Sequence, residues 1–325
     1  MNNLKDRVEI GKTGLQAFKM GFGAGVVGNT MMYPKMDDTT SEKLIRTALN
    51  QGIEMIDTAY LYGMGRSEEL IGETIYKHGK RENVIISTKA SSNPQFGQNG
   101  LEVDNSPSAL RQAVDDSLKR LQTDYIDIFY LHFPYSTTPL TESADTLAQL
   151  KKEGKIKAIG ASNLNFQQLQ EFNKEGHLDV LQAEYSLLVR HVEQDIIPYC
   201  LENHISLIPF FPLASGLLAG AYKKEDVFTD TSRLNNPLFQ KEAFLANLKR
   251  VEQLKDFAKN KGVQPAQIAL AWLLTRPAVD LIIPGATKPD QITGNLQALA
   301  IELAEAELNE LNTIFNQDTK HVSRE

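Results

Sequence analysis

The sequence predicts an α/β protein of the (β/α)8 TIM barrel class. Short apolar segments typical of strands alternate with helical segments along all 325 residues, and no low-complexity linker interrupts them. Most of these strands are apolar runs, as expected of parallel strands that are buried on both faces. Eight strand–helix units without a change in composition fit one closed barrel, so we expect a single domain over residues 1–325.

A β-hairpin and a first barrel strand are predicted at the start of the chain. Residues 8–10 and 16–18 flank the turn sequence Gly11-Lys12-Thr13-Gly14, a pattern typical of a hairpin. Residues 19–23 then follow as the first strand of the barrel.

The later elements follow from apolar runs and from helix start signals. The other seven barrel strands are predicted near residues 55–57, 84–87, 126–132, 156–160, 180–185, 205–210 and 281–283. Thr39 and Glu42 form a capping box for the first helix, and Ser106-Pro107 supplies a cap and a first-turn proline after the third strand. Further helices are predicted near residues 67–76, 140–152, 195–203, 242–260, 265–275, 290–300 and 304–315.

Composition argues against several classes of function. A net charge of −7 disfavours a nucleic-acid surface. No apolar run approaches the ~20 residues of a membrane span, and the polar start lacks the apolar core of a signal peptide. Cys200 is the single cysteine, which excludes an intrachain disulfide and a cysteine-rich metal site, and we expect a packed thiol. We therefore predict a cytoplasmic protein without metal, nucleic-acid or membrane partners.

Four chemically active side chains lie at or just after the ends of three consecutive predicted strands: Asp57, Tyr62, Lys89 and His132. They should converge, because parallel strands of a barrel end at the same face. Lys89 is expected to lower the pKa of the Tyr62 phenol from about 10, and Asp57 to hold the lysine. His132 can donate a hydrogen bond to a carbonyl oxygen. This set suits carbonyl reduction, with hydride supplied by a nicotinamide cofactor.

Each of these residues also has a simpler interpretation. Asp57 could cap a turn, Tyr62 could pack in an aromatic loop, Lys89 could end a strand in solvent, and His132 could be structural. Four such residues at converging strand ends favour a site. Lys89 at a strand end would also permit a Schiff-base lyase, but a firm ion pair with Asp57 would keep the amine protonated and poorly nucleophilic.

A glycine-rich segment imitates a different fold. Gly23-Ala24-Gly25-Val26-Val27-Gly28 matches the dinucleotide fingerprint of Rossmann domains. Residues 29–38 separate it from the first helix start signal, and Asp57 comes later than the ~20 residues expected after the glycines. We interpret these glycines as a flexible loop at the mouth of the barrel.

Six segments resemble the aldo-keto reductases, in that family's order, within residues 8–315. They are residues 56–63, 86–89, 130–134, 159–163, 181–185 and 283–286. In detail the chain is most similar to a bacterial branch that includes reductases from inositol-utilisation operons. The resemblance implies a (β/α)8 barrel with an N-terminal β-hairpin at its bottom and extra helices. It also implies reduction of aldehydes or ketones to alcohols with NADPH.

The resemblance assigns a role to each of the four residues. Tyr62 would be the general acid, Lys89 and Asp57 would tune it, and His132 would orient the substrate carbonyl. Some relatives with the same four residues instead serve as redox-sensing regulatory subunits of potassium channels, so a cofactor-binding protein with little turnover stays an alternative. Small carbonyl compounds are the expected partners, and the oligomeric state is not predicted.

The same resemblance implies where a cofactor would bind. Residues matching those that hold the nicotinamide are Ser162, Asn163, Gln182 and Phe210, the last standing where most relatives have tyrosine. Residues matching the loop over the pyrophosphate and a basic residue near the phosphates are Pro212, Leu213, Ser215, Gly216, Leu217 and Arg233. Residues matching the adenosine half of the site are Gly285, Thr287, Lys288, Gln291 and Asn295.

Lys288 is the basis for preferring NADP over NAD. It is the only cation in residues 285–295, and a 2′-phosphate requires a positive charge or a bidentate fork. Gln291 stands where many relatives have arginine. Substrate contacts are expected from the loops at residues 90–105, 133–139 and 213–237, with candidate aromatic residues Tyr33, Phe96, Phe133 and Tyr135.

Overall fold

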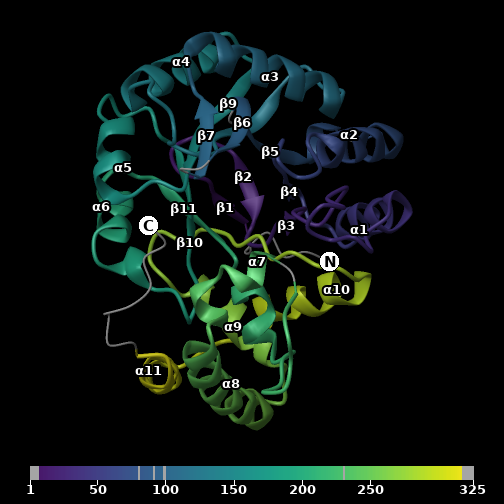
Figure 1. Cartoon of the computed structure of the whole chain (residues 1–325), viewed down its shortest axis with the longest axis vertical. Helices are drawn as coiled ribbons and strands as arrows, with labels where there is room; N and C mark the ends of the chain where they lie inside the picture. The colour runs from purple at the N-terminus through teal and green to yellow at the C-terminus, as the bar shows by residue number, and fades with distance from the viewer. Residues whose placement is uncertain (1–6, 80, 91, 98–99, 230, 317–325) are drawn as a thin grey trace.

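A curled sheet of seven parallel strands forms the centre of the molecule, in the order β11-β10-β9-β8-β5-β4-β3. The computed structural model describes residues 7–316 except 80, 91, 98–99 and 230. The strands are β3 (Phe22–Gly23), β4 (Met55–Asp57), β5 (Ile85–Ala90), β8 (Ile126–Leu131), β9 (Ile156–Ser162), β10 (Val180–Glu184) and β11 (Ser206–Phe210). Helices surround the sheet (Figure 1).

The segment after helix α9 (Pro265–Leu274) closes the sheet into a barrel. Ile282 forms a parallel bridge with Met20 beside β3. At the opposite edge, the backbone N–H of Leu207 in β11 donates to the carbonyl of Ala278 at 2.8 Å. The predicted (β/α)8 class is therefore confirmed, although residues 281–283 pair only through isolated bridges.

The helices place their apolar faces against this sheet. They are α1 (Asp38–Asn50), α2 (Arg66–His78), α3 (Pro107–Leu121), α4 (Leu140–Lys152), α5 (Phe166–Phe172), α6 (Ile196–Glu202), α8 (Lys241–Lys261), α9 (Pro265–Leu274), α10 (Pro289–Leu296) and α11 (Glu305–Ile314). Cys200 of α6 is buried, as predicted for a packed thiol, and burial raises its pKa to about 12. In the described part of the chain, none of the helices combines the length and apolarity needed to span a bilayer.

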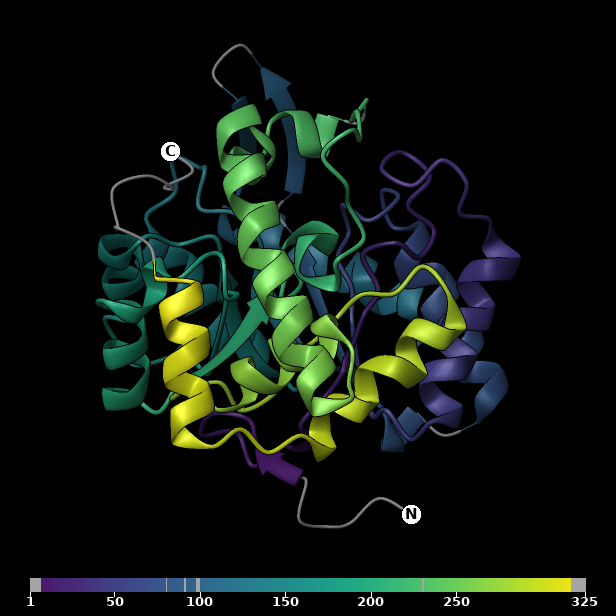
Figure 2. The same cartoon turned by 90° about the horizontal axis from the view of Figure 1, so that it is seen from below.

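The N-terminal hairpin covers the bottom of the barrel. Strand β1 (Arg7–Glu9) pairs antiparallel with β2 (Gln16–Phe18), as predicted. Ile10 and Ala17 are fully buried among apolar side chains of the barrel interior. Figure 2 shows this purple hairpin at the lower end of the molecule and a second, blue hairpin at the upper end.

That second hairpin corrects the prediction of a loop at residues 90–105. Strand β6 (Ser92–Gly97) pairs antiparallel with β7 (Gly100–Asp104). Its sequence has weak strand propensity, and the pairing gains tertiary support where the N–H of Val103 donates to the carbonyl of Tyr135 at 3.0 Å.

The start of α1 also differs from the prediction. Asp37, rather than Thr39, is the N-cap, and its carboxylate accepts a hydrogen bond of 2.7 Å from the N–H of Thr40. Asp37 begins the helix two residues earlier because a carboxylate also interacts favourably with the positive end of the helix dipole. Thr39 and Glu42 consequently lie within the helix and form no capping box.

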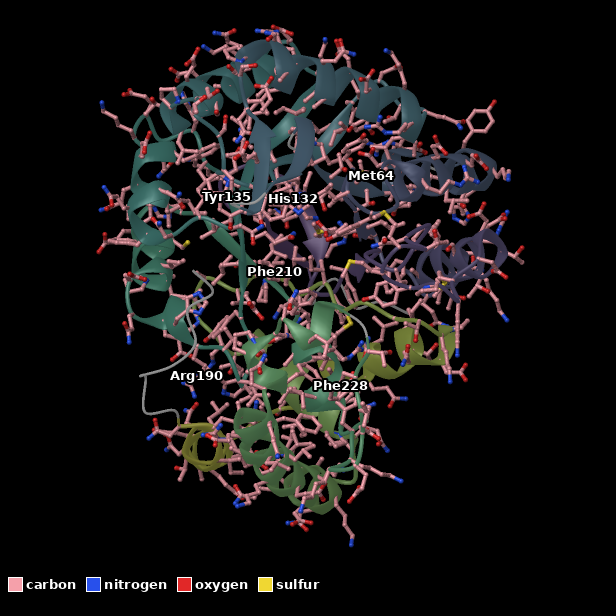
Figure 3. The ribbon with its side chains drawn as sticks, in the orientation of Figure 1. Met64, His132, Tyr135, Arg190, Phe210 and Phe228 are labelled. Carbon is pink, nitrogen blue, oxygen red and sulfur yellow. The ribbon has the colours of Figure 1, made fainter. Side chains whose placement is uncertain are left out.

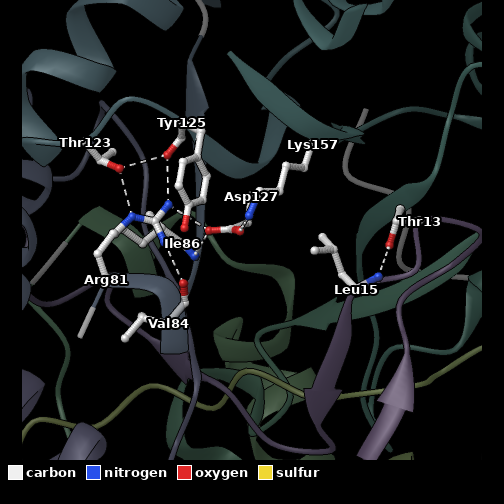
Figure 4. Close-up of polar contacts among 9 residues, drawn as sticks. All are labelled: Thr13, Leu15, Arg81, Val84, Ile86, Thr123, Tyr125, Asp127 and Lys157. Carbon is white, nitrogen blue, oxygen red and sulfur yellow. Dashed lines mark hydrogen bonds and ion pairs between the residues drawn. The ribbon is translucent and has the colours of Figure 1, made fainter. Parts of the chain in front are cut away.

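A charged cluster near the start of three neighbouring strands holds them in register (Figure 4). The buried carboxylate of Asp127 in β8 accepts hydrogen bonds from Arg81 at 2.8 Å and from the N–H of Ile86 in β5 at 3.0 Å. Its other oxygen accepts one from Lys157 in β9 at 3.0 Å. Fixing these strands at one end helps to align the functional residues at the other.

Candidate active site

A buried ion pair forms the base of the site. The ammonium of Lys89, in β5, donates to Asp57 Oδ2 and to the carbonyl of Thr58, both at 2.7 Å. Asp57 ends the neighbouring strand β4, and its Oδ1 accepts hydrogen bonds from Ser87 at 2.6 Å and Gln182 at 3.0 Å. Asp57 and Lys89 are only 2% and 1% exposed, so hydrogen bonds must replace the lost hydration of both charges.

Tyr62 lies above this pair in the turn after β4. The ammonium of Lys89 is 5.5 Å from the centre of its ring. Burial raises the pKa of the Tyr62 phenol, and the negative charge of Asp57 and the nearby Tyr33 raise it further. The expectation of a lowered pKa at Tyr62 is therefore wrong for this structure, because burial, followed by the charge of Asp57, raises it. The phenol keeps its proton at neutral pH.

His132 follows β8 and faces Tyr62 edge to face, with ring centres 6.4 Å apart. Burial lowers the pKa of its imidazole well below the usual value, and the charge of Lys89 lowers it further. Its Nδ1 is buried without a hydrogen-bond partner. An unpaired N–H there would be costly, so the neutral ring favours its proton on Nε2, the nitrogen that can then donate.

The glycine-rich segment packs against the loop that carries Tyr62 and does not start a helix. Residues 25–28 form a turn, and α1 begins only at Asp38. A Cβ on Gly63 would lie 2.1 Å from the carbonyl oxygen of Gly28, and one on Gly25 would contact the Tyr62 ring. These glycines thus permit close approach of two loops at the barrel mouth, and the rejection of a Rossmann opening is confirmed.

Polar residues from the next strands lie beside the ion pair. Asn163, directly after Ser162 at the end of β9, donates from Nδ2 to the carbonyl of His132 at 3.0 Å and to Ser162 Oγ at 3.1 Å. Gln182 in β10 is buried and bonds to Asp57. Phe210 ends β11 and is partly exposed at the same end of the barrel, close to His132 in the view of Figure 3.

A second group of predicted residues follows β11. Pro212 and Leu217 are buried, whereas Leu213, Ser215 and Gly216 are partly exposed. Ser215 and Gly216 lie in the 3-10 segment η4 (Ala214–Ala219) with positive φ angles of 54° and 94°. Arg233, in α7 (Thr231–Leu234), is connected to this segment through the hydroxyl of Tyr222.

A third group lies at the start of α10. Thr287, Lys288 and Gln291 are exposed, and Gln291 Oε1 accepts hydrogen bonds from the N–H groups of Thr287 at 2.7 Å and Lys288 at 3.1 Å. Gly285 bridges Gly23 at the closing edge of the barrel. Asn295, further along α10, is buried.

Aromatic side chains form one wall beside the site. The rings of His132 and Phe133 stack at 4.2 Å, and those of Phe133 and Tyr135 at 5.7 Å. Tyr135 is about half exposed at the rim (Figure 3). The side chain of Phe96 lies outside those that the structure describes.

Three residues that build the site were not predicted from the sequence. Ser87 bonds to Asp57, and the Tyr130 ring lies 5.5 Å from the Lys89 ammonium. Tyr222 connects Arg233 to Ser215. A serine in an otherwise apolar strand was a usable signal for Ser87, whereas nothing in the local sequence distinguishes Tyr222 from an ordinary packing tyrosine.

Comparison with known proteins agrees with this geometry. The model of the Aldo/keto reductase family matches residues 19–316. The chain belongs to this family. It is 37% identical over 308 residues to the aldo-keto reductase YhdN of Bacillus subtilis (strain 168), covering 94% of this chain and 92% of the relative.

Two further similar proteins illustrate the range of named activities. The chain is 34% identical over 313 residues to the NADH-specific methylglyoxal reductase of Escherichia coli (strain K12), covering 93% of this chain and 95% of that protein. The structure of the glycerol dehydrogenase AKR11B4 from Gluconobacter oxydans is similar with a TM-score of 0.88, at 29% identity and 99% coverage of both chains. Family membership supports carbonyl reduction with a nicotinamide cofactor.

Proposed function

We propose that this aldo-keto reductase reduces aldehydes or ketones to alcohols with NADPH, with Tyr62 as the general acid. The observation that carries the proposal is the buried Lys89–Asp57 pair directly beneath a protonated phenol and beside a neutral imidazole. Bound nicotinamide would supply the hydride. A carbonyl that receives hydride becomes an alkoxide, which is a far stronger base than a phenolate, so Tyr62 can donate its proton even with a raised pKa.

The remaining residues of the site would orient the substrate and stabilise charge. Nε2–H of His132 would hold the carbonyl oxygen near the Tyr62 hydroxyl. Lys89 would stabilise the phenolate that remains after proton transfer, since its charge lies under the ring while Asp57 holds it there. Regeneration then requires one proton from solvent to return to the phenol.

The proposed cofactor site fits a dinucleotide. The partly buried amide of Asn163 and the buried amide of Gln182 suit a carboxamide at the centre of the barrel. Ser215 and Gly216, whose φ angles are both positive, form a tight turn that Tyr222 links to Arg233, and Arg233 adds positive charge for the phosphates. Gly285 and Asn295 would contribute to the adenosine half, together with Thr287 and Gln291.

We infer a preference for NADP from Lys288, whose exposed side chain at the start of α10 can reach a 2′-phosphate. The NADH-specific relative makes this a point to test directly. The ratio of kcat/KM with NADPH to that with NADH should fall about tenfold in Lys288→Met, because one charged contact is lost. An unchanged ratio would remove Lys288 from this role.

The decisive experiment measures NADPH oxidation with a panel of aldehydes for the wild-type chain and for Tyr62→Phe. We expect kcat to fall by about two or more orders of magnitude in Tyr62→Phe with near-normal cofactor binding, since the ring stays while the proton donor is lost. Tyr76→Phe is the matched control, with near-normal kcat, because the Tyr76 side chain is exposed on α2 and belongs to no part of the site. Full activity in Tyr62→Phe would refute the assignment of the acid.

The two alternatives predict other outcomes. A redox-sensing protein would bind NADPH tightly and turn it over very slowly with every aldehyde. A Schiff-base lyase would give a covalent adduct on Lys89 after borohydride treatment with a carbonyl compound. The burial of Lys89 and its two hydrogen bonds weigh against the lyase, because the amine has no open path to a substrate.

A further inference from the structure

Tyr222 occupies an unusual position in the segment that follows β11. Its ring packs edge to face against Phe228 and Phe239, with centres 5.3 and 5.5 Å apart. Its hydroxyl donates a hydrogen bond to the carbonyl of Ser215 at 2.7 Å and accepts one from Nε of Arg233 at 2.9 Å. One phenol therefore connects the two ends of the segment from Ser215 to Arg233.

The segment that accepts this hydrogen bond has a demanding conformation. Ala214, Ser215 and Gly216 have φ angles of 48°, 54° and 94°, a region that side-chain-bearing residues seldom adopt. Such a run persists only where neighbours hold it. The Tyr222 hydroxyl fixes the Ser215 carbonyl, and a Cβ on Gly216 would lie 3.1 Å from the same oxygen.

Arg233 is held by the same cluster of rings. Its guanidinium carbon lies 5.6 Å from the centre of the Tyr222 ring and about equally far from Phe228 at 6.0 Å and Phe239 at 5.9 Å. The hydrogen bond from Nε fixes the plane of the guanidinium, which decides whether its fork can meet a phosphate. Figure 3 shows Phe228 on the side of the barrel mouth nearest α8.

We propose that Tyr222 is a positioning residue for the cofactor phosphates, and that it acts by joining Arg233 to the backbone of Ser215–Gly216. This inference rests on the proposed function, in which both partners contact the dinucleotide. The hydroxyl holds the guanidinium next to the turn at Ser215–Gly216 before the ligand binds, so that binding has less to order.

The test is a double-mutant cycle on NADPH affinity, measured by calorimetry on the full chain without substrate. Tyr222→Phe keeps the ring and removes the hydroxyl, and Arg233→Gln removes the charge. We expect each variant to weaken the Kd for NADPH about tenfold. The double variant should bind within about twofold of Arg233→Gln, because the hydroxyl acts through the arginine.

Two results would overturn the proposal. The first is a Kd for NADPH within about twofold of wild type in Tyr222→Phe. The second is a double variant in which the two single losses of affinity multiply, as they do for independent effects. Tyr199→Phe is the control, since it removes a hydroxyl that accepts a hydrogen bond from Asn173 beside α6, and its Kd should not change. A wild-type chain that binds neither NADPH nor NADH would refute the proposed function itself, which keeps the two failures distinct.

Arg233→Lys covers the case in which Tyr222→Phe folds poorly, with a Tm lowered by more than about 10 °C. Lysine keeps the positive charge. Its single amine cannot donate to the Tyr222 hydroxyl and also offer a phosphate the two parallel donors of a guanidinium. We expect a loss of NADPH affinity close to that of Arg233→Gln. Wild-type affinity in Arg233→Lys would contradict the positioning role.

Discussion

The ammonium of Lys89 lies 2.7 Å from the carboxylate of Asp57, and the two side chains are almost completely buried. Asp57 has two further donors, Ser87 and Gln182, on its other oxygen. The pair is thus held from three strands, β4, β5 and β10. This arrangement ties the chemistry of the site to the stability of the barrel.

Removing one partner of this pair should destabilise the fold more than removing both. Lys89→Met leaves the Asp57 charge buried without its ammonium, which costs about 3–5 kcal/mol of the free energy of unfolding. The double variant Asp57→Asn/Lys89→Met removes both charges and should recover part of that loss. Urea denaturation monitored by circular dichroism measures the stability of the single and the double variant. Equal midpoints for Lys89→Met and wild type would contradict the expectation.

Tyr62 should stay protonated well into the alkaline range. Burial, followed by the charge of Asp57, raises its pKa above the ordinary value of about 10. A spectroscopic titration of tyrosinate absorbance should therefore show no difference between wild type and Tyr62→Phe below about pH 10. A missing titration step in Tyr62→Phe below that pH would mean that the phenol ionises early after all.

His132 should make the protein less stable in mild acid. Burial, and then the charge of Lys89, lowers its folded pKa below the unfolded value of about 6.5. The unfolded chain then binds more protons below about pH 6.5, so stability is full above that pH and falls as the pH drops toward the folded pKa.

Urea denaturation at about pH 7 and pH 5 tests this contribution. His132→Gln should show a smaller fall in stability between the two values than wild type. His191→Gln is a useful comparison, because burial lowers the pKa of His191 as well. Its contribution to the fall in stability should be lost in that variant, independently of His132. An identical fall in His132→Gln and wild type would show that His132 contributes nothing to the acid sensitivity.

Gly160 should not tolerate a side chain, because the Tyr130 ring fills the space. A Cβ there would lie 2.2 Å from Tyr130 Cδ1, so the ring, whose centre lies 5.5 Å from the Lys89 ammonium, would have to move. Gly160→Ala should cost about 1–3 kcal/mol of stability or more. The control Gly294→Ala lies in α10 with open space around it and should be neutral or slightly stabilising. Equal denaturation midpoints for the two variants would contradict this account of Gly160.

Much of the fold follows from the sequence because the signals are local. Apolar runs identified the barrel strands, and Ser106-Pro107 identified the start of α3, since strand burial and helix capping depend on neighbouring residues. The order of strands also brought Asp57, Lys89 and His132 to one end, because parallel strands share a direction. The hairpin β6–β7 escaped prediction, since its weak strand propensity is overcome only by pairing.

The sequence by itself therefore determined the barrel, the family and the identity of the residues at its mouth. Tertiary structure alone decided their protonation and their partners. The pKa of Tyr62 rises because the folded chain buries the phenol and places it near the charge of Asp57, an arrangement that no motif encodes. In the same way, Tyr222 meets Arg233 only after the segment following β11 has folded back on itself, because hydrogen bonds join residues by proximity in space.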